Sequence, residues 1–223
     1  MNKTKFGLTA AHLRILALFL MLLDHLWGTV VPGNDWMTYV GRMAFPIFAF
    51  QAAQGYHHTH DFKGYCKRLA LFALVSEIPF NLMISGSPIF PFHQNVMLTL
   101  LFGLLACRAW DQKKWWMAAL IFLACVVTFP DYGVMGVLTV LMFHVLRDWK
   151  WAQLLMLIAI NWYGFEGQQL VFGFFKMPLQ AFAILAFIPI ALYNGEKGKG
   201  GKALQYGSYI FYPLHMLILG LMG

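Results

Sequence analysis

The sequence predicts an all-α fold, namely a polytopic integral membrane bundle of about nine transmembrane helices with a cytoplasmic N-terminus. The 223 residues are 60% hydrophobic and only 11% charged, with a mean hydropathy of +0.64. A typical soluble domain is about 25% charged. Apolar runs recur along the whole chain, and the basic residues fall in alternate breaks between them. We therefore expect residues 1–223 to form a single transmembrane domain.

Each predicted helix is an apolar run bounded by charges, Gly, Pro or His. The runs cover residues 13–31, 38–56, 69–84, 95–109, 115–129, 133–146, 151–163, 177–193 and 206–222. Several are shorter than the ~20 residues that a bilayer requires, so eight and ten spans are the alternative counts.

The orientation follows from the positive charges, because cytoplasmic loops of membrane proteins are enriched in Lys and Arg. With the N-terminus inside, every Lys and Arg except Arg42 and Lys176 falls in a cytoplasmic segment. The last of these segments, NGEKGKGGK (194–202), is predicted to be a flexible loop. Because the net charge of +7 is spread over such loops, it indicates orientation and argues against binding of nucleic acid.

The first run, LRILALFLMLLDHL, carries Arg14 and His25. Eleven helical steps of about 100° bring His25 to within about 20° of the Arg14 direction, about 16 Å further along the helix. Ionisable residues inside a membrane helix are expensive to bury, so they mark functional sites by default. The shared face predicts chemistry performed within the bilayer.

The other polar groups at membrane depth are expected to gather in the outer leaflet. They are Asp24, Arg42, Glu77, His93, Gln94, Asn95, Asp131, Tyr132 and His215, with Glu166 in the loop before the eighth span. Asp24 points about 100° away from its neighbour His25, so we expect it to pair with Arg42 on another helix. Glu77 is the second carboxylate that could balance Arg42 or His25.

Each of these groups also has a purely structural interpretation. Arg42 and a carboxylate would then fix helix packing, residues 93–95 would cap the fourth span, and His215 would be a hydrogen-bonded core histidine. Glu166 is interpreted as a solvated loop residue. The run HHTHD (57–61) lacks the i, i+4 spacing of helical metal ligands, so we expect a structural role for it and no metal.

Several segments resemble the TraX family, in that family's order and across nearly the whole chain. They are LRILALFLMLLDHL, YVGRMAFPIFAFQAAQGYHHT, RLALFALVSEIPFNL, NVMLTLLFGLLA, DYGVMGVL and YGSYIFYPLHMLIL. The family is named for a conjugation protein implicated in N-terminal acetylation of pilin. TraX-like proteins resemble the membrane acyltransferase-3 superfamily, whose first span carries an arginine, ten residues and an essential histidine. Arg14 and His25 match that pattern.

The resemblance implies transfer of an acetyl group from cytoplasmic acetyl-CoA to an extracytoplasmic acceptor, in a multi-pass protein of the bacterial cytoplasmic membrane. The acceptor could be a peptide, a glycan or a lipid, and analogy favours an N-terminal amine. His25 would be the general base. Arg14 would hold the phosphates of acetyl-CoA, with Asn95 as a further donor-binding residue.

The remaining residues receive supporting roles under the same hypothesis. Arg42 or Asn95 would stabilise the oxyanion, and Asp24 or Glu77 would stabilise the imidazolium. Asp131, Tyr132 and His215 would form the acceptor site; these assignments complete the predicted site.

Two other classes of protein stay open at this point. A small transporter would use the polar residues as a proton relay or translocation site, although no repeat of one half in the other is visible in the sequence. A non-catalytic assembly factor would leave Arg14 and His25 unexplained. Direct transfer is favoured over an acyl-histidine intermediate, and the choice between N- and O-acetylation is open.

Overall fold

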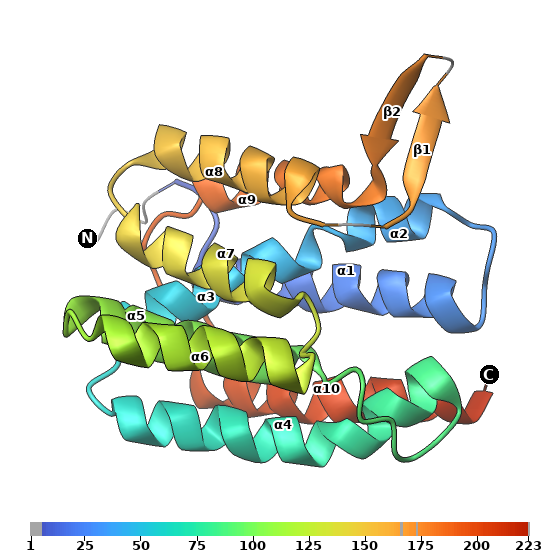
Figure 1. The fold of residues 1–223 in the computed structure, drawn as a ribbon, viewed down its shortest axis with the longest axis horizontal. Coiled ribbons are helices and arrows are strands. Elements are labelled where there is room, and N and C mark those ends of the chain that lie inside the picture. Colours follow the sequence, from blue (N-terminus) through green and yellow to red (C-terminus); the bar gives the residue numbers. More distant parts are fainter. Residues whose placement is uncertain (1–5, 166, 173, 223) are drawn as a thin grey trace.

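The structure is a computed structural model that describes residues 6–165, 167–172 and 174–222. Lys3, Lys5 and Glu166, which enter the sequence predictions, lie outside these residues. Helices lie side by side in a bundle, and α1 begins at the end opposite to the one where α10 ends (Figure 1). The predicted all-α class is confirmed.

Most predicted runs form a single helix, and the ends agree with the prediction within about three residues except that α4 and α10 begin earlier than predicted. These helices are α1 (Ala10–Thr29), α4 (Phe62–Ser85), α5 (Val96–Asp111), α6 (Trp115–Thr128), α7 (Gly133–Val145), α8 (Lys150–Tyr163) and α10 (Gly201–Met222). Within the described residues, two of them, α1 and α4, have the length and apolarity to cross a membrane. The segments α6, α7 and Leu179–Ala191 are apolar but shorter.

The second predicted run is divided into α2 (Trp36–Gly41) and α3 (Ala44–His58). A continuous helix would need the residue 46 amide to bond the carbonyl of Arg42, and Pro46 has no amide hydrogen. The break therefore falls at Arg42 and Met43, and it places Arg42 at a helix junction.

The eighth predicted run is wrong at its beginning. A hairpin of β1 (Gln169–Phe172) and β2 (Phe175–Pro178) precedes it, in an antiparallel register that pairs Leu170 with Met177. The run itself begins as the 3-10 helix η1 (Leu179–Ala186) and ends as α9 (Phe187–Ala191). The hairpin projects beside α2 at the end of the bundle where α1 finishes (Figure 1).

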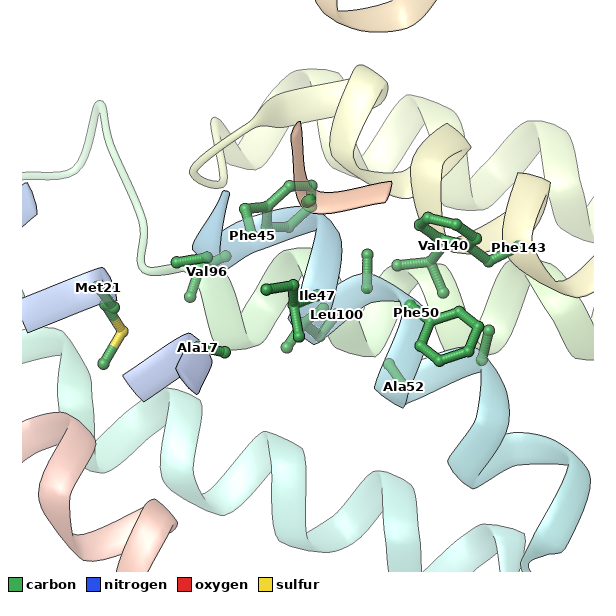
Figure 2. Packing of buried hydrophobic residues seen from close by; sticks show 14 of the residues in the cluster. Ala17, Met21, Phe45, Ile47, Phe50, Ala52, Val96, Leu100, Val140 and Phe143 are labelled. Atoms are coloured by element: carbon green, nitrogen blue, oxygen red, sulfur yellow. The ribbon is translucent and has the colours of Figure 1, made fainter. Parts of the chain in front are cut away.

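The core is built around α3, whose apolar side chains are buried on several faces. Phe45, Ile47 and Phe50 of α3 meet side chains from α1, α5 and α7 (Figure 2). Phe50 packs edge-to-face on Phe143 of α7, with ring centroids 5.4 Å apart.

Candidate functional site

The end of the bundle where α1 finishes contains a cavity of about 340 Å³, here called the polar cavity. Its polar lining includes Asp24, His25, Arg42, His93, Asp131 and Tyr132, which come from four separate parts of the chain. Gly41 allows α2 to approach α1 here, because a Cβ atom at this position would lie 2.5 Å from the Cβ of Asp24. Close helix packing thus puts Arg42 opposite α1.

Asp24 and Arg42 form the predicted ion pair. Nη2 of Arg42 lies 3.0 Å from Oδ1 of Asp24, and the hydroxyl of Thr38 donates to the same oxygen at 2.6 Å. Nε of Arg42 in turn donates to the Thr38 hydroxyl at 3.2 Å. Thr38 is one helical turn before Arg42, so the sequence spacing could have identified it. The three side chains fix the guanidinium at the cavity wall.

His25 is held by another histidine and not by a carboxylate. Nδ1 of His25 lies 2.8 Å from Nε2 of His215, and the rings stack with centroids 5.0 Å apart. Nδ1 of His215 lies 2.8 Å from the carbonyl of Phe211, which can only accept a hydrogen bond. In neutral His215, Nε2 is therefore the acceptor, so Nδ1 of His25 donates and Nε2 of His25 keeps its lone pair.

His215 was predicted to form part of the acceptor site, but the structure places it outside the lining of the polar cavity. It is only 5% exposed. It lies behind His25, where it sets the tautomer of that ring. Sequence spacing could not reveal this contact because the two histidines are 190 positions apart.

Glu77 and Asn95 are also placed differently from the prediction. Asn95 is fully buried at the beginning of α5, and its amide donates to Glu77 at 2.5 Å and to the carbonyl of Ala73 at 2.8 Å. Its side-chain oxygen accepts from the Met97 amide. The amide hydrogens of Asn95 are thus used within the fold, and neither residue lines the polar cavity. Asn95 caps α5, as the structural interpretation expected, and its contact with Glu77 connects α4 to α5.

His93 and Asp131 form a second pair in the polar cavity. Nε2 of His93 lies 3.3 Å from Oδ1 of Asp131, which also accepts from the backbone amide of Tyr132 at 3.0 Å. The hydrogen bond to Asp131 raises the pKa of His93 above its usual value, against the opposing effect of partial burial. The prediction assigned Asp131 and Tyr132 to the acceptor site; it placed His93 in the same polar cluster, with a helix cap as the alternative, and gave it no catalytic role.

A second cavity, of about 450 Å³, lies where α1 begins and is called the cationic cavity. Its lining includes Arg14, Arg68, Lys197, Lys199 and Lys202, and no Asp or Glu among the described residues. Nε of Arg68 is buried without a hydrogen-bond partner in the described structure.

The predicted flexible loop is attached to α1 at this point. The first amides of α1 bond to its carbonyls, Ala10 to Glu196 at 2.8 Å and Ala11 to Lys197 at 3.1 Å. Gly198, at φ +75°, lies so close to Thr9 that a Cβ atom would overlap the Thr9 hydroxyl. The first amides of a helix have no partner within the helix, and here they hold a loop that carries lysines next to Arg14.

A narrow cavity of about 90 Å³ shares lining residues with both of the larger ones. It shares Arg14, Gln51, Tyr65, Gln205 and Tyr209 with the cationic cavity, and Met21, Phe48, Val96 and Tyr212 with the polar cavity. The three cavities therefore lie in a series along α1, from Arg14 to His25, in which each shares lining residues with the next.

A groove of about 270 Å³, here called the outer groove, continues from the polar cavity. It shares Trp27, Arg42, Asp131 and Tyr132 with that cavity, and its far wall includes Gln168 and Gln180 beside the β1–β2 hairpin. The prediction did not include this wall, because the hairpin was not recognised.

The HHTHD run lies at the opposite end from the polar cavity. Nε2 of His57 lies 3.2 Å from Nδ1 of His144, whose Nε2 lies 2.8 Å from Asp111. Tyr56 donates to the same carboxylate at 2.7 Å. These contacts join α3, α5 and α7, so they connect helices as the structural interpretation expected.

The fold and site thus define a helical protein with a polar cavity at one end of the bundle and a cationic cavity at the other. The family described as TraX protein matches residues 9–223, and the chain belongs to that family. It is 26% identical over 237 residues to a protein of Dichelobacter nodosus named "Probable fimbrial assembly protein FimC, serogroup H1". The match covers 95% of this chain and 94% of the relative. No solved structure matches the chain.

Proposed function

We propose that the protein is an integral membrane acetyltransferase that moves an acetyl group from cytoplasmic acetyl-CoA to an extracytoplasmic acceptor. The acceptor is proposed to be the N-terminal amine of a peptide or protein. The observation that carries this proposal is the series of cavities with shared lining residues that begins at the cationic cavity and ends at His25. An anionic donor can bind at one end of this series while its reactive group lies at the other.

The proposal places the whole bundle in the bacterial cytoplasmic membrane as a multi-pass protein. The two long apolar helices support this location, and so do exposed apolar side chains on α4 and α6. Leu74 and Ile78 of α4 and Leu123 and Val127 of α6 are each more than half exposed, which suits contact with lipid tails. The end that bears the cationic cavity is then cytoplasmic by the positive-inside rule.

The residues of the cationic cavity fit the phosphates of acetyl-CoA. Arginine pairs bidentately with phosphate and lysine acts as a compact cation, and both types are present without a competing carboxylate in the described lining. The unpartnered Nε of Arg68 is a buried donor that such a ligand would satisfy. The narrow cavity fits the thin pantetheine arm.

His25 is proposed to act as the general base. Its Nε2 lone pair would take a proton from the acceptor nitrogen as the N–C bond forms at the thioester carbonyl. The C–S bond then breaks, and His25 returns the proton to the departing thiolate. His215 is proposed to orient this imidazole through the contact between its Nε2 and Nδ1 of His25, a role that the sequence had not assigned.

Arg42 is the proposed oxyanion stabiliser, since its guanidinium lines the polar cavity and is fixed by Asp24 and Thr38. Asn95 is not proposed for this role because its amide is engaged elsewhere. The outer groove would admit the acceptor, and the fimbrial name of the relative supports a protein acceptor for this chain as well.

Turnover of acetyl-CoA by the purified protein in nanodiscs tests the proposal. Release of free CoA should depend on added peptides with free N-termini and should not respond to N-acetylated peptides or glycans. His25→Ala should lower the rate by about 10²- to 10⁴-fold. The exposed His60 lies in none of the described cavities, so His60→Ala is the matched control.

Binding of acetyl-CoA, measured separately by calorimetry, separates the alternatives. Absence of binding and turnover in folded protein would overturn the proposal. Passage of a solute across the membrane without acetyl transfer would instead identify a carrier.

A further inference from the structure

The polar cavity contains two imidazoles, and the proposed reaction has used only one of them. His25 lies on α1, whereas His93 lies in the loop before α5 and is paired with Asp131 of the turn between α6 and α7. The side chains of His93 and Asp131 are 44% and 31% exposed, so this pair is in contact with solvent. Asp131 also lines the outer groove.

Charge distinguishes the two carboxylates of the polar cavity. Asp24 is neutralised by Arg42, which carries a permanent positive charge. Asp131 has an imidazole as its ion-pair partner, and no Lys lines either the polar cavity or the outer groove among the described residues. With His93 neutral, this part of the site carries an unmatched negative charge.

The number of protons released in the proposed reaction indicates a role for the His93–Asp131 pair. An α-amino group has a pKa of about 8 and so arrives mainly as an ammonium ion at pH 7. Conversion of R–NH₃⁺ and a thioester into an amide and a thiol removes two protons from nitrogen. One of them ends on the thiol sulfur, by way of His25, and the other must go to solvent. A hydroxyl acceptor loses only one proton, so a single base would suffice for it.

We propose that Asp131 binds the ammonium group of the acceptor and that His93 removes its first proton and passes it to the outer solvent. This inference rests on the proposed acetyl transfer and assigns an additional catalytic residue to the same site. The amine then attacks the thioester while His25 takes the second proton. The bond to Asp131 makes His93 a stronger base than an isolated imidazole, which favours the transfer.

The groups around His93 agree with this role. Glu77 of α4 lies close enough to favour its protonated form, and the ring edge of Phe80 contacts the imidazole at a centroid distance of 5.3 Å. Asp24 and Arg42, from α1 and the α2–α3 junction, line the same cavity as a neutral pair. Tyr132 of the α6–α7 turn, Tyr212 of α10 and His25 of α1 are the other titratable groups that line it.

The pH dependence of acetylation in the His93→Gln variant tests the inference. Without His93, the reactive acceptor is the small fraction of amine that is already deprotonated in solution. At subsaturating acceptor, the rate of the variant should then rise about tenfold per pH unit up to the amine pKa of about 8. At pH 7 it should be about tenfold lower than the wild-type rate. Above pH 9 the two rates should converge. Glutamine keeps a hydrogen-bonding group of similar length beside Asp131.

Two further measurements decide the outcome. Asp131→Asn should raise the acceptor KM with acetyl-CoA affinity unchanged, and an acceptor amine of lower pKa should restore the His93→Gln rate at pH 7. A rate deficit of His93→Gln that is the same at every pH would overturn the inference while leaving the acetyltransferase proposal intact. Failure of the wild-type protein to use acetyl-CoA would instead overturn the proposed function. The elution profile in detergent and acetyl-CoA binding show whether each variant is folded.

Discussion

The cationic cavity and the polar cavity lie at opposite ends of α1, and they differ in whether their charged side chains are paired. Around the polar cavity, Asp24, Arg42 and His25 each have a hydrogen-bonded partner at 2.6–3.0 Å. Around the cationic cavity, none of the described cations takes part in an ion pair of the described structure. Side chains that pair with one another fix the geometry of the polar cavity. Unpaired charges of one sign, as in the cationic cavity, attract a ligand of the opposite charge.

This difference predicts that mutations will have different consequences at the two ends. At the polar cavity, loss of one charge leaves a partly buried partner behind, so both stability and activity should fall. At the cationic cavity, loss of one charge relieves repulsion between like charges, so only binding should suffer.

The largest effect is expected for Asp24→Ala. This change leaves the Arg42 guanidinium and the Thr38 hydroxyl without their acceptor, and breaking a buried pair on one side costs about 3–5 kcal/mol. The side chains of Arg42 and Asp24 are 23% and 16% exposed, so solvent should reduce the loss to the lower end of about 3 kcal/mol. Denaturant unfolding in detergent measures it.

A double variant provides the control for this prediction. Asp24→Ala combined with Arg42→Ala should be less destabilised than the sum of the two single variants, because no charge is left behind. Additive losses of unfolding free energy would show that the interaction between Asp24 and Arg42 does not stabilise the fold.

Arg14→Ala should have the next largest effect, and it should appear in binding alone. Loss of a charge-assisted hydrogen bond of about 1.5–3 kcal/mol corresponds to acetyl-CoA binding that is about 10- to 100-fold weaker. Unfolding free energy should be unchanged, and the loss should shrink at high salt. Lys63→Ala is the matched control, since Lys63 is exposed and lines neither of the two larger cavities. Equal effects of both variants would indicate nonspecific attraction.

His215→Ala should lower the acetylation rate by about tenfold without changing acetyl-CoA affinity, because His25 would lose the partner that fixes its tautomer. His215→Asn, which can accept a hydrogen bond from His25, should recover part of the rate. An unchanged rate in His215→Ala would show that His25 needs no orienting partner.

Local pattern predicted much of the fold, since the helices follow the apolar runs and the Asp24–Arg42 pair follows from the 100° helical step. Depth in the membrane, in contrast, does not identify lateral neighbours. Glu77 and Asn95 were placed at the correct end of the bundle, but they bond to each other and not to His25 or Arg42. The hairpin was missed because its apolar strand residues, ending at Met177 and Pro178, merge with the next apolar run.

The smallest predicted effect concerns stability and pH at the His93–Asp131 pair. Because the folded pKa of His93 is raised, its pairing stabilises the fold below the unfolded value of about 6.5, and this contribution disappears as pH rises through the folded pKa. For groups this exposed the gain is below about 1 kcal/mol. Thermal unfolding at pH 5.5 and pH 8.5 should show wild type more stable than His93→Gln at the lower pH only. Since the catalytic deficit of that variant is also expected below pH 8, activity must be compared at a temperature where both proteins are folded. A stability difference confined to pH 8.5 would mean that Asp131 prefers a neutral partner, and the ammonium-binding role would then lose its electrostatic basis.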